Sequence, residues 1–325
     1  MEKEKDVFTK RELSEIYLYL SRGDLPVKYA YKTEAGSQAW VDLENSKSND
    51  EYTPYAVYES NLLLKNESIY LTGLDDDSMV IFDFGPGEGR PVEKFLKKIS
   101  KNKKVFYHAF DISQKILVKN KEKIMNISEK IFYNSDIIDF EDSSFFDIVM
   151  NAKQKYGNNN VVALLLGNTV GNFSSINSIL KNMMSPFSTE DRFVVGIAKS
   201  DLKNNNWIEN VTKGYSSSLP TKNLSFSTIE YLGISKLDAI YSAEFNEKEN
   251  AISMIATFNK DVSVNINGKD LVFKKDQKIR IAKSEKVDDI KMTKVFDDLN
   301  MRIVNMSTSE DDNYVQFCLS NKNFF

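Results

Sequence analysis

The chain has 325 residues and a formal net charge of −4, from 43 basic and 47 acidic side chains mixed along its length. This length exceeds one typical domain, and the balanced charge points to no nucleic-acid or membrane partner. Cys318 is the only cysteine, which excludes intrachain disulfides and cysteine-based zinc sites. With no apolar signal segment and no apolar run of membrane-spanning length, we expect a cytoplasmic globular protein.

By their pattern, residues 1–60 form helices and loops with many tyrosines. The middle of the chain then alternates between apolar strand patterns and amphipathic helix patterns. The predicted strands are Met79–Asp83, Lys104–Asp111, Lys130–Asn134, Val161–Leu166 and Arg192–Ala198. The predicted helices are Arg90–Ser100, one from the N-cap Ser113 to about Asn126, and Asn172–Met184. This alternation predicts a doubly wound parallel sheet.

The C-terminal part has a different pattern. Residues 200–284 begin with a polar helix and end in short strands at Ala251–Phe258, Val262–Ile266, Leu271–Phe273 and Lys278–Ala282. Residues 287–299 supply a helix, and a polar turn joins strands Met301–Ser307 and Tyr314–Ser320 into a hairpin. We therefore assign residues 61–199 and 286–325 to a sheet-containing domain, and residues 1–60 and 200–285 to a second domain.

A glycine turn follows the first predicted strand. The strand ends in Asp83 and runs into Gly85, Gly87 and Gly89, and the next strand ends in Asp111. Glycines let the backbone bend tightly and approach a ligand, and a helix starting near position 90 presents free N–H groups. The G-x-G-x-G spacing is not the dinucleotide fingerprint, and Asp83 would repel a pyrophosphate. An acid here suits a cationic ligand without phosphate, and Asp111 can accept both hydroxyls of a ribose.

The D-x-G-x-G-x-G turn, with a following strand that ends in aspartate, resembles motif I and the next acidic loop of class I methyltransferases that use S-adenosylmethionine (SAM). The alternative is an ordinary glycine turn between a strand and a helix. The resemblance implies SAM as the cofactor. The predicted fold is α/β, with a class I SAM-methyltransferase Rossmann-like sheet, a C-terminal antiparallel hairpin and a second α+β lid domain.

The run L-L-L-G-N-T-V-G-N-F at residues 164–173 closely resembles the F-L-G-S-T-I-G-N-F run of one methyltransferase group. That group contains the histidine Nα-methyltransferase of ergothioneine biosynthesis and the fungal dimethylallyltryptophan N-methyltransferase. Weaker similarities follow in order along nearly the whole chain, at Lys28–Tyr31, Gly36–Ser37, Glu51–Pro54, Glu59, Tyr215, Ile252–Met254 and Ser284–Lys286. The resemblance implies a monomeric two-domain enzyme in which SAM lies on the sheet and the lid holds an amino acid.

The resemblance also implies roles for residues around the cofactor. Gly85 and Gly87 would line its methionyl part, Asp111 would hold the ribose, and Asp136 would accept from the exocyclic amine of adenine. Arg90 would reach the methionyl carboxylate. The full predicted cofactor-binding set is Asp83, Gly85, Gly87, Gly89, Arg90, Asp111, Ile112, Asp136, Ile137, Gly167 and Asn168.

Asn172 and Tyr215 are the implied catalytic residues. Asn172 would accept a hydrogen bond from the substrate α-amine, while Tyr215, with Tyr52 or Thr53, would grip the carboxylate or the amine. The predicted substrate-binding set is Tyr31, Tyr52, Thr53, Asn172, Tyr215, Met254, Ala282 and Ser284. No group of His, Cys, Asp and Glu has metal-ligand spacing, so no metal is expected.

Position alone also singles out Asn172. It lies beyond the carboxyl end of a buried strand, where open α/β sheets bind ligands. Its side-chain carbonyl can orient the lone pair of an amine toward a sulfonium methyl group without adding charge. The alternative is that Asn172 caps the following helix, and the two roles are compatible.

The chain departs from the histidine enzyme at Ala282, where that enzyme has an acid that recognises imidazole. Without a carboxylate the site lacks a partner for an imidazole N–H. Histidine is therefore not the expected substrate, and a larger or more apolar amino acid, aromatic or indolic, is. Met254 forms one wall of this pocket or, equally well, packs in the core of the lid.

Three functions remain open on the sequence. The first is a SAM-dependent N-methyltransferase of a small amino acid or amino-acid-derived metabolite of specialised metabolism. The second is an O- or carboxyl-methyltransferase, and the third is a non-catalytic SAM-fold binding protein, which the intact Asp83, Gly85, Gly87 and Asp111 argue against. His108, the single histidine, is expected to be structural. The expected partner is a small-molecule substrate.

Overall fold

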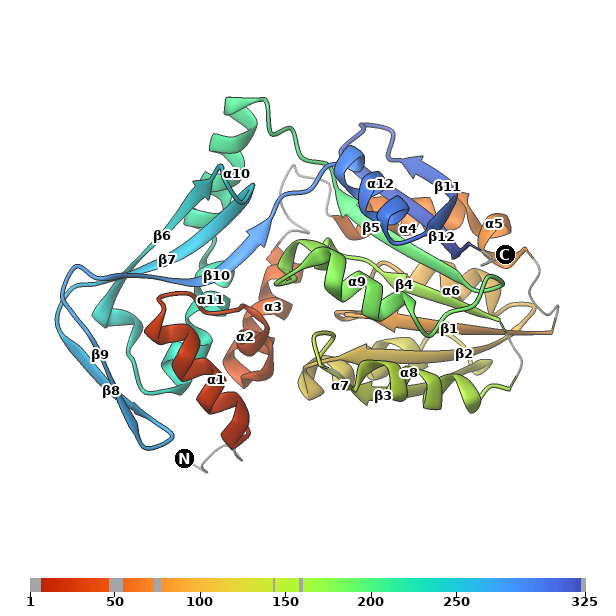
Figure 1. Cartoon of the computed structure of the whole chain (residues 1–325). Helices are drawn as coiled ribbons and strands as arrows, with labels where there is room; N and C mark the ends of the chain where they lie inside the picture. Colours follow the sequence, from red (N-terminus) through yellow and green to blue (C-terminus); the bar gives the residue numbers. More distant parts are fainter. Residues whose placement is uncertain (1–6, 47–54, 73–76, 143, 158–159, 323–325) are drawn as a thin grey trace. The chain divides into compact units, whose positions relative to one another are not determined.

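The computed structural model describes residues 7–46, 55–72, 77–142, 144–157 and 160–322 (Figure 1). The chain divides into two compact units. We call Lys47–Ser200 with Val287–Phe325 the sheet domain, and Met1–Ser46 with Asp201–Lys286 the insert domain. Each domain is described by itself below.

In the described part of the sheet domain, the strands form one seven-stranded sheet in the order β11-β12-β5-β4-β1-β2-β3 (Figure 1). Neighbours among β1 to β5 are parallel, whereas β12 runs antiparallel to both β5 and β11. The strands are β1 (Ser78–Phe84), β2 (Lys104–Asp111), β3 (Ile131–Ile137), β4 (Val161–Leu165), β5 (Arg192–Ala198), β11 (Met301–Thr308) and β12 (Tyr314–Asn321). The predicted α/β sheet with its C-terminal antiparallel hairpin is thus confirmed.

Helices cover both faces of this sheet, which explains why its central strands are apolar along their whole length. Side chains of β1 alternate between the faces, so that Val80, Phe82 and Phe84 enter one core cluster and Met79 and Ile81 enter the other. The helices of the first face are α8 (Phe145–Gln154), α9 (Ile176–Met184) and α12 (Asp289–Asp298). Those of the second are α4 (Tyr55–Lys65), α5 (Glu67–Leu71), α6 (Glu93–Ile99) and α7 (Gln114–Met125).

Helix α4 changes the predicted domain boundary. The sequence assigned residues 1–60 to the lid, but the first of the two segments that form the insert domain ends at Ser46. Helix α4 packs against α6 and β12, and it buries Leu63 in the core of the sheet domain. The apolar face of this helix is satisfied by the sheet domain, and a short helix pattern alone does not reveal which partner it packs against.

The insert domain combines helices with two small sheets. Strands β10, β7 and β6 pair antiparallel in that order, and β8 pairs with β9 in a hairpin. Its strands are β6 (Ala239–Asn246), β7 (Ala251–Phe258), β8 (Val262–Ile266), β9 (Lys269–Phe273) and β10 (Lys278–Glu285). Its helices are α1 (Lys10–Ser21), α2 (Lys28–Lys32), α3 (Glu34–Ser46), α10 (Asn205–Ser217), α11 (Leu219–Tyr231) and the 3₁₀ turn η2 (Lys236–Asp238).

The sequence missed the helices α5, α8 and α11 and the strand β6. Helix α11 has no clear apolar stripe because it buries small polar side chains, among them Ser225, Ser227 and Thr228. It packs tightly on α3, where a Cβ on Gly36 would lie 2.6 Å from the Oγ of Ser227. A helix buried on several sides by small residues lacks the periodic signal that predicts an amphipathic helix.

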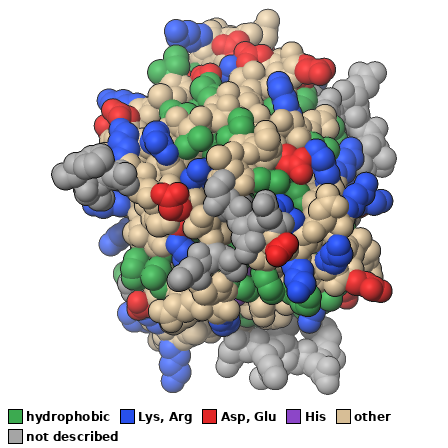
Figure 2. Space-filling view, turned by 90° about the vertical axis from the view of Figure 1, so that its right-hand side faces the viewer, with side chains coloured by type: hydrophobic (Ala, Val, Ile, Leu, Met, Phe, Trp, Pro, Cys, Tyr) green, Lys and Arg blue, Asp and Glu red, His purple; other side chains and the backbone are tan. Residues whose placement is uncertain are grey.

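On the face that Figure 2 shows, basic and acidic side chains are interspersed, with hydrophobic side chains scattered between them. Among the described residues, no helix combines the length and the apolar character needed to cross a membrane. Cys318 lies in β12 and is 1% exposed, so its predicted place in a buried strand is confirmed.

Candidate functional site

The carboxyl edge of the sheet contains the point where the strand order reverses. From β1 the chain builds β2 and β3 on one side, and then β4 and β5 on the other. The helices that follow β1 and β4 therefore lie on opposite faces of the sheet, and open α/β sheets bind ligands beside the loops at such a point. The glycine turn after β1 and the G-N-T-V-G-N loop after β4 both start at this point.

The turn after β1 is held close to its neighbours. The Gly85 N–H donates to the carbonyl of Phe110 over 2.8 Å, and a Cβ at Gly85 would lie 3.5 Å from the Oγ1 of Thr169. Gly85 and Gly87 have φ values of +67° and +54°, in the left-handed region that favours glycine. The turn thus lies against the loop after β4, with its glycines in conformations that a side chain would strain.

Gly89 is positioned by helix α7. Its φ is +84°, and a Cβ there would lie 2.9 Å from both Asn120 and Ile124 of that helix. The predicted start of the following helix near Arg90 is wrong, because α6 begins at Glu93. Pro91 disfavours the helical conformation of the residue before it, so two further turns precede the helix. Arg90 is one of these turn residues, and its guanidinium lies 3.4 Å from Glu88.

Asp83, at the end of β1, is almost completely buried, with 2% of its surface exposed. Its carboxylate accepts a 2.5 Å hydrogen bond from the hydroxyl of Tyr107. Burial disfavours the charged form and raises the pKa of Asp83 to about 7, although the Tyr107 bond opposes this. A cation placed beside this carboxylate would restore its charge.

Asp111, at the end of β2, is oriented by the backbone after it. One of its oxygens accepts from the Ser113 N–H over 2.8 Å, and Ile112 lies between the two residues. The Ser113 side chain in turn accepts from the Ile116 N–H over 3.3 Å, so the predicted N-cap of α7 is confirmed. The carboxylate is thereby fixed at the carboxyl end of β2.

Asp136 lies inside β3, which extends to Ile137 and is longer than predicted. Its carboxylate lies 2.8 Å from Nε2 of His108, and the hydroxyl of Tyr156 lies 3.1 Å from Nδ1. His108 is 0% exposed and stacks on Phe110, so its predicted structural role agrees with its burial. Burial lowers the pKa of His108 despite Asp136, which favours a neutral ring that donates to Asp136 and accepts from Tyr156.

The loop after β4 is tied down at several points. The Gly167 N–H donates to the carboxylate of Glu59, a buried residue of α4 that also accepts from the Tyr314 hydroxyl. Asn168 adopts a left-handed conformation with φ of +57°, and its side-chain oxygen accepts from the Ala198 N–H over 3.3 Å. In the sequence, Glu59 stands out only as part of the resemblance to the methyltransferase group, and nothing there predicts its hydrogen bond to Gly167.

Asn172 ends a 3₁₀ turn, η1 (Thr169–Asn172), and does not continue into a helix as predicted. Helix α9 begins at Ile176 with Ser175 as its N-cap, so the alternative that Asn172 caps this helix is wrong. Phe173, with an extended backbone, separates the two elements. Asn172 is half-buried at the end of the loop.

In the insert domain, several predicted substrate residues lie together. The Tyr215 hydroxyl of α10 is 3.0 Å from the Oγ of Ser284 on β10, and Met254 of β7 pairs directly with Ala282 of β10. Met254 is 4% exposed and belongs to the core cluster of this domain, as does Ala282. These contacts favour the core role of Met254 and leave its role as a pocket wall a prediction.

The sequence-predicted set omitted a residue that completes this group. The Nζ of Lys286 lies 2.7 Å from the Tyr215 hydroxyl and 3.0 Å from the Ser284 Oγ. Alternation along β10 could have indicated it, since positions 282, 284 and 286 follow the period of two of a strand. Tyr31 lies instead on α2, where its ring meets Trp40 edge to face.

Some predictions about the site stay predictions. Tyr52 and Thr53 fall outside the described residues. Asn172 belongs to the sheet domain and Tyr215 to the insert domain, so their joint action on one substrate is not tested by either domain alone. Among the described residues, no group of three or more His, Cys, Asp or Glu could hold a metal ion.

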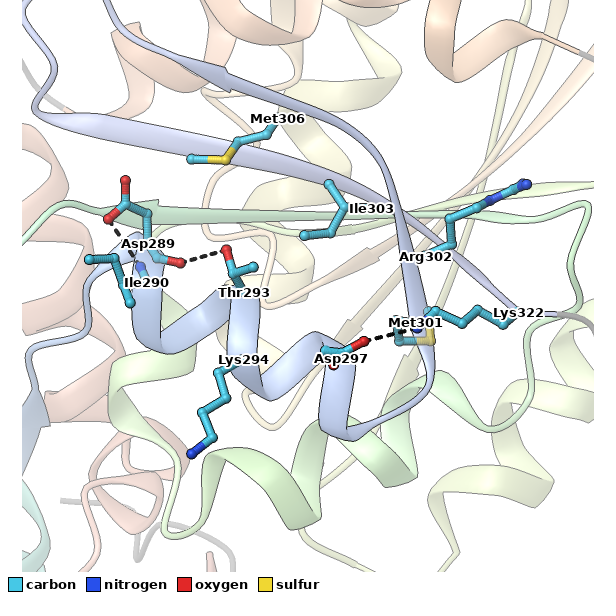
Figure 3. Close-up of a pocket in the computed structure, with 10 residues that line it drawn as sticks. All are labelled: Asp289, Ile290, Thr293, Lys294, Asp297, Met301, Arg302, Ile303, Met306 and Lys322. Carbon is cyan, nitrogen blue, oxygen red and sulfur yellow. Dashed lines mark hydrogen bonds and ion pairs between the residues drawn. The ribbon is translucent and has the colours of Figure 1, made fainter.

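A cavity of about 730 Å³ lies elsewhere in the sheet domain, between α12 and the edge strand β11 (Figure 3). Ile290, Ile303 and Met306 give it an apolar lining, and Asp297 beside it is bonded to Lys322 over 3.0 Å. None of the residues that line it belongs to the predicted site, so the cavity is separate from that site.

Comparisons with known proteins agree with this geometry. Residues 12–321 match the family described as histidine-specific methyltransferase, SAM-dependent. No curated protein matches the chain. Among solved structures, the carbon methyltransferase CurJ gives a TM-score of 0.50 at 10% identity, over 97% of this chain and 71% of that chain. The glycopeptide N-methyltransferase MtfA, solved with SAM, gives 0.41 at 8% identity, over 84% and 96%.

Fold and family together define a SAM-dependent methyltransferase. Because the match spans nearly the whole chain, the protein belongs to the family of SAM-dependent methyltransferases described as histidine-specific. The residues present fit the SAM cofactor, since Asp83 and Asp111 place two carboxylates near the ends of the neighbouring strands β1 and β2. Such acceptors suit a sulfonium, an ammonium and the hydroxyls of a ribose, and do not suit a phosphate.

Proposed function

We propose that the protein is an N-methyltransferase that acts on the amine of a small amino acid or amino-acid-derived metabolite other than histidine, with an aromatic or indolic side chain. The observation that carries the proposal is the pairing of Ala282 with Met254 beside Tyr215 and Ser284. An alanine methyl group and a methionine thioether at this place would pack against a ring, and neither accepts from an imidazole N–H.

The sheet domain would hold the cofactor and orient the nucleophile. Gly85, Gly87 and Gly167 let the backbone approach SAM, while Asp111 accepts from its ribose. When bound, SAM supplies an activated methyl group on a positively charged sulfur. The side-chain oxygen of Asn172 would accept an N–H from a neutral substrate amine and so fix the direction of its lone pair. Alignment at about 3–3.5 Å and exclusion of water are the main contributions needed, without a strong base.

A substrate screen tests this proposal. The full-length protein is incubated with SAM and the common amino acids together with indolic derivatives, and products are identified by mass spectrometry before and after base hydrolysis. We expect a base-stable N-methylated product of an aromatic or indolic amino acid. A base-labile methyl ester, or histidine as the best substrate, would contradict it.

Asn172 can be tested in the same assay. Asn172→Ala removes the acceptor for the substrate amine, and we expect a loss of about 10- to 100-fold in kcat/KM with little change in SAM affinity. Asn177→Ala, on an exposed position of α9, is the matched control and should retain activity. Equal activity of both variants would remove Asn172 from the proposed mechanism.

Ala282 provides a gain-of-function test. Ala282→Glu returns a carboxylate to the pocket and should shift relative kcat/KM toward histidine, because an imidazole N–H regains an acceptor. Ala282→Gln has nearly the same volume without the charge and serves as the control. If both variants lose all substrates equally, the effect is steric and the assignment of this position to side-chain recognition fails.

A further inference from the structure

The Tyr215, Ser284 and Lys286 side chains form one connected group, which we call the lysine cluster. Lys286 directs one N–H to the Tyr215 hydroxyl over 2.7 Å and another to the Ser284 Oγ over 3.0 Å. Its Nζ also lies 4.5 Å from the centre of the Tyr215 ring, a cation–π arrangement. Tyr215 comes from α10 and Ser284 from β10, while Lys286 directly follows β10, and all three belong to the insert domain.

Lys286 is a buried charge for which the described part of the chain supplies no acidic partner. Only 8% of its surface is exposed, and among the described residues no Asp or Glu oxygen lies within 4 Å of its Nζ. Neighbouring basic residues do have acids, since Arg280 pairs with Asp24 and Glu249, and Lys283 lies 3.9 Å from Glu249. Burying an ammonium costs several kcal/mol unless it is paired, and two neutral hydroxyls compensate this cost only in part.

The donor arithmetic leaves room for an anion. An ammonium has three N–H donors, and Lys286 directs two of them to the hydroxyls of its cluster. A ligand carboxylate would accept the third donor and supply the missing negative charge. A protonated amine would instead be repelled by Lys286, which bears on whether Tyr215 holds the amine or the carboxylate of a substrate.

We propose that the lysine cluster is the anion-binding part of the substrate site, and that Lys286 binds the carboxylate of the amino acid. This inference rests on the proposed function and assigns one end of the substrate. Tyr215 and Ser284 hold the ammonium in place by accepting from it, and their hydroxyls lie beside the carboxylate that it binds. The amine then lies away from the cluster, and a substrate without a carboxylate loses this contact.

The first experiment compares matched substrate pairs on the full-length enzyme. The pairs are tryptophan with tryptamine, tyrosine with tyramine, and phenylalanine with phenethylamine. For the pair whose amino acid is methylated, we expect the amine to have a KM about 10- to 100-fold higher, as for loss of a hydrogen bond to a charged group. Lys286→Met should raise KM for the amino acid by a similar factor and leave KM for the amine nearly unchanged.

The control is Lys283→Met, which removes a lysine of β10 that lies beside Glu249, and it should leave both KM values unchanged. If the amine is methylated as efficiently as the matching amino acid, or if Lys286→Met leaves KM for the amino acid unchanged, the lysine inference is overturned and the proposed function still stands. Absence of any N-methylated amino acid or amine overturns the proposed function, and the carboxylate assignment with it.

A second measurement needs no substrate. If the Lys286 charge is retained for a ligand, its removal should not weaken the free protein, since an unneutralised buried ammonium is a cost to stability. Lys286→Met should therefore unfold in urea at the same concentration as the wild type or a higher one. A clearly lower midpoint would mean that the ammonium has a structural role and would overturn the inference.

Discussion

At the scale of single residues, the site depends on buried polar groups whose charge the fold controls. Asp83 is the clearest case, because its burial raises its pKa to about 7 while Tyr107 donates to it. A ligand-free enzyme near neutral pH thus contains this residue in both protonation states. Binding of a cation beside Asp83 would favour the carboxylate and release a proton.

The stability of the ligand-free protein should report this pKa. The folded pKa lies above the unfolded value of 3.8, so the folded state binds the additional proton between about pH 4 and 7. The free energy of unfolding contributed by Asp83 should therefore fall as pH rises through this window and level off above about 7. Urea unfolding of the wild type and Asp83→Asn at several pH values measures it, as the difference between the two proteins.

Two further results sharpen the Asp83 test. Tyr107→Phe removes the bond that lowers the pKa of Asp83, so the window should extend to higher pH. Saturating SAM should shift it to lower pH. A difference between wild type and Asp83→Asn that does not vary with pH would show that this carboxylate is not protonated in the folded state.

At the scale of elements, the loop after β4 is fixed by contacts that its own sequence does not reveal. Glu59 of α4 accepts from the Gly167 N–H, and Asn168 accepts from the Ala198 N–H at the end of β5. Its left-handed conformation at Asn168, with φ of +57°, is rarely adopted by residues other than glycine and asparagine. These contacts fix the position of η1 and therefore of Asn172, its last residue.

Two substitutions at Asn168 separate the hydrogen bond from the conformation. Asn168→Gly loses the bond to Ala198 but tolerates the positive φ, and we expect a loss of about 0.5–1.5 kcal/mol in the free energy of unfolding. Asn168→Ala loses the bond and must also adopt the left-handed conformation, which costs about 1–2 kcal/mol more. Urea unfolding should rank wild type, glycine and alanine in that order, and equal values for the two variants would contradict the conformational argument.

At the scale of the whole molecule, the chain supports two compact domains, one with core clusters on both faces of the large sheet and one with its core on the strands β10, β7 and β6. The predicted cofactor residues all belong to the sheet domain. Those predicted substrate residues that are described belong mostly to the insert domain, with Asn172 as the exception. The division of labour proposed here is thus a division between the two domains.

Hydrogen exchange with mass spectrometry should separate the two roles. SAM at about 100 times its dissociation constant should add about 2.7 kcal/mol to the free energy of unfolding. Its local protection should concentrate after β1, β2 and β4, at residues 85–92, 111–113 and 167–172. A substrate amino acid should add protection around Tyr215 and residues 284–286. Protection by SAM that is confined to the insert domain would contradict the cofactor assignment.

The sequence by itself determined the alternating elements of the sheet, the antiparallel hairpin, the glycine turn and the family. These features are local, because a buried strand, an N-cap such as Ser113 or a glycine turn is encoded within a few adjacent residues. Helix starts were less accurate, as at Glu93 and Ile176, because turn geometry there competes with helix propensity.

Only the tertiary structure decided which distant residues meet. The tether of Gly167 to Glu59, the pairing of His108 with Asp136 and the burial of Lys286 beside Tyr215 join residues far apart in the sequence. Helix α11 escaped prediction because several of its buried side chains are small and polar, and the predicted boundary at residue 60 cut through α4 because the partner of this helix is fixed by packing. Charge and burial at a site depend on such long-range contacts, and a pattern read along one chain does not contain them.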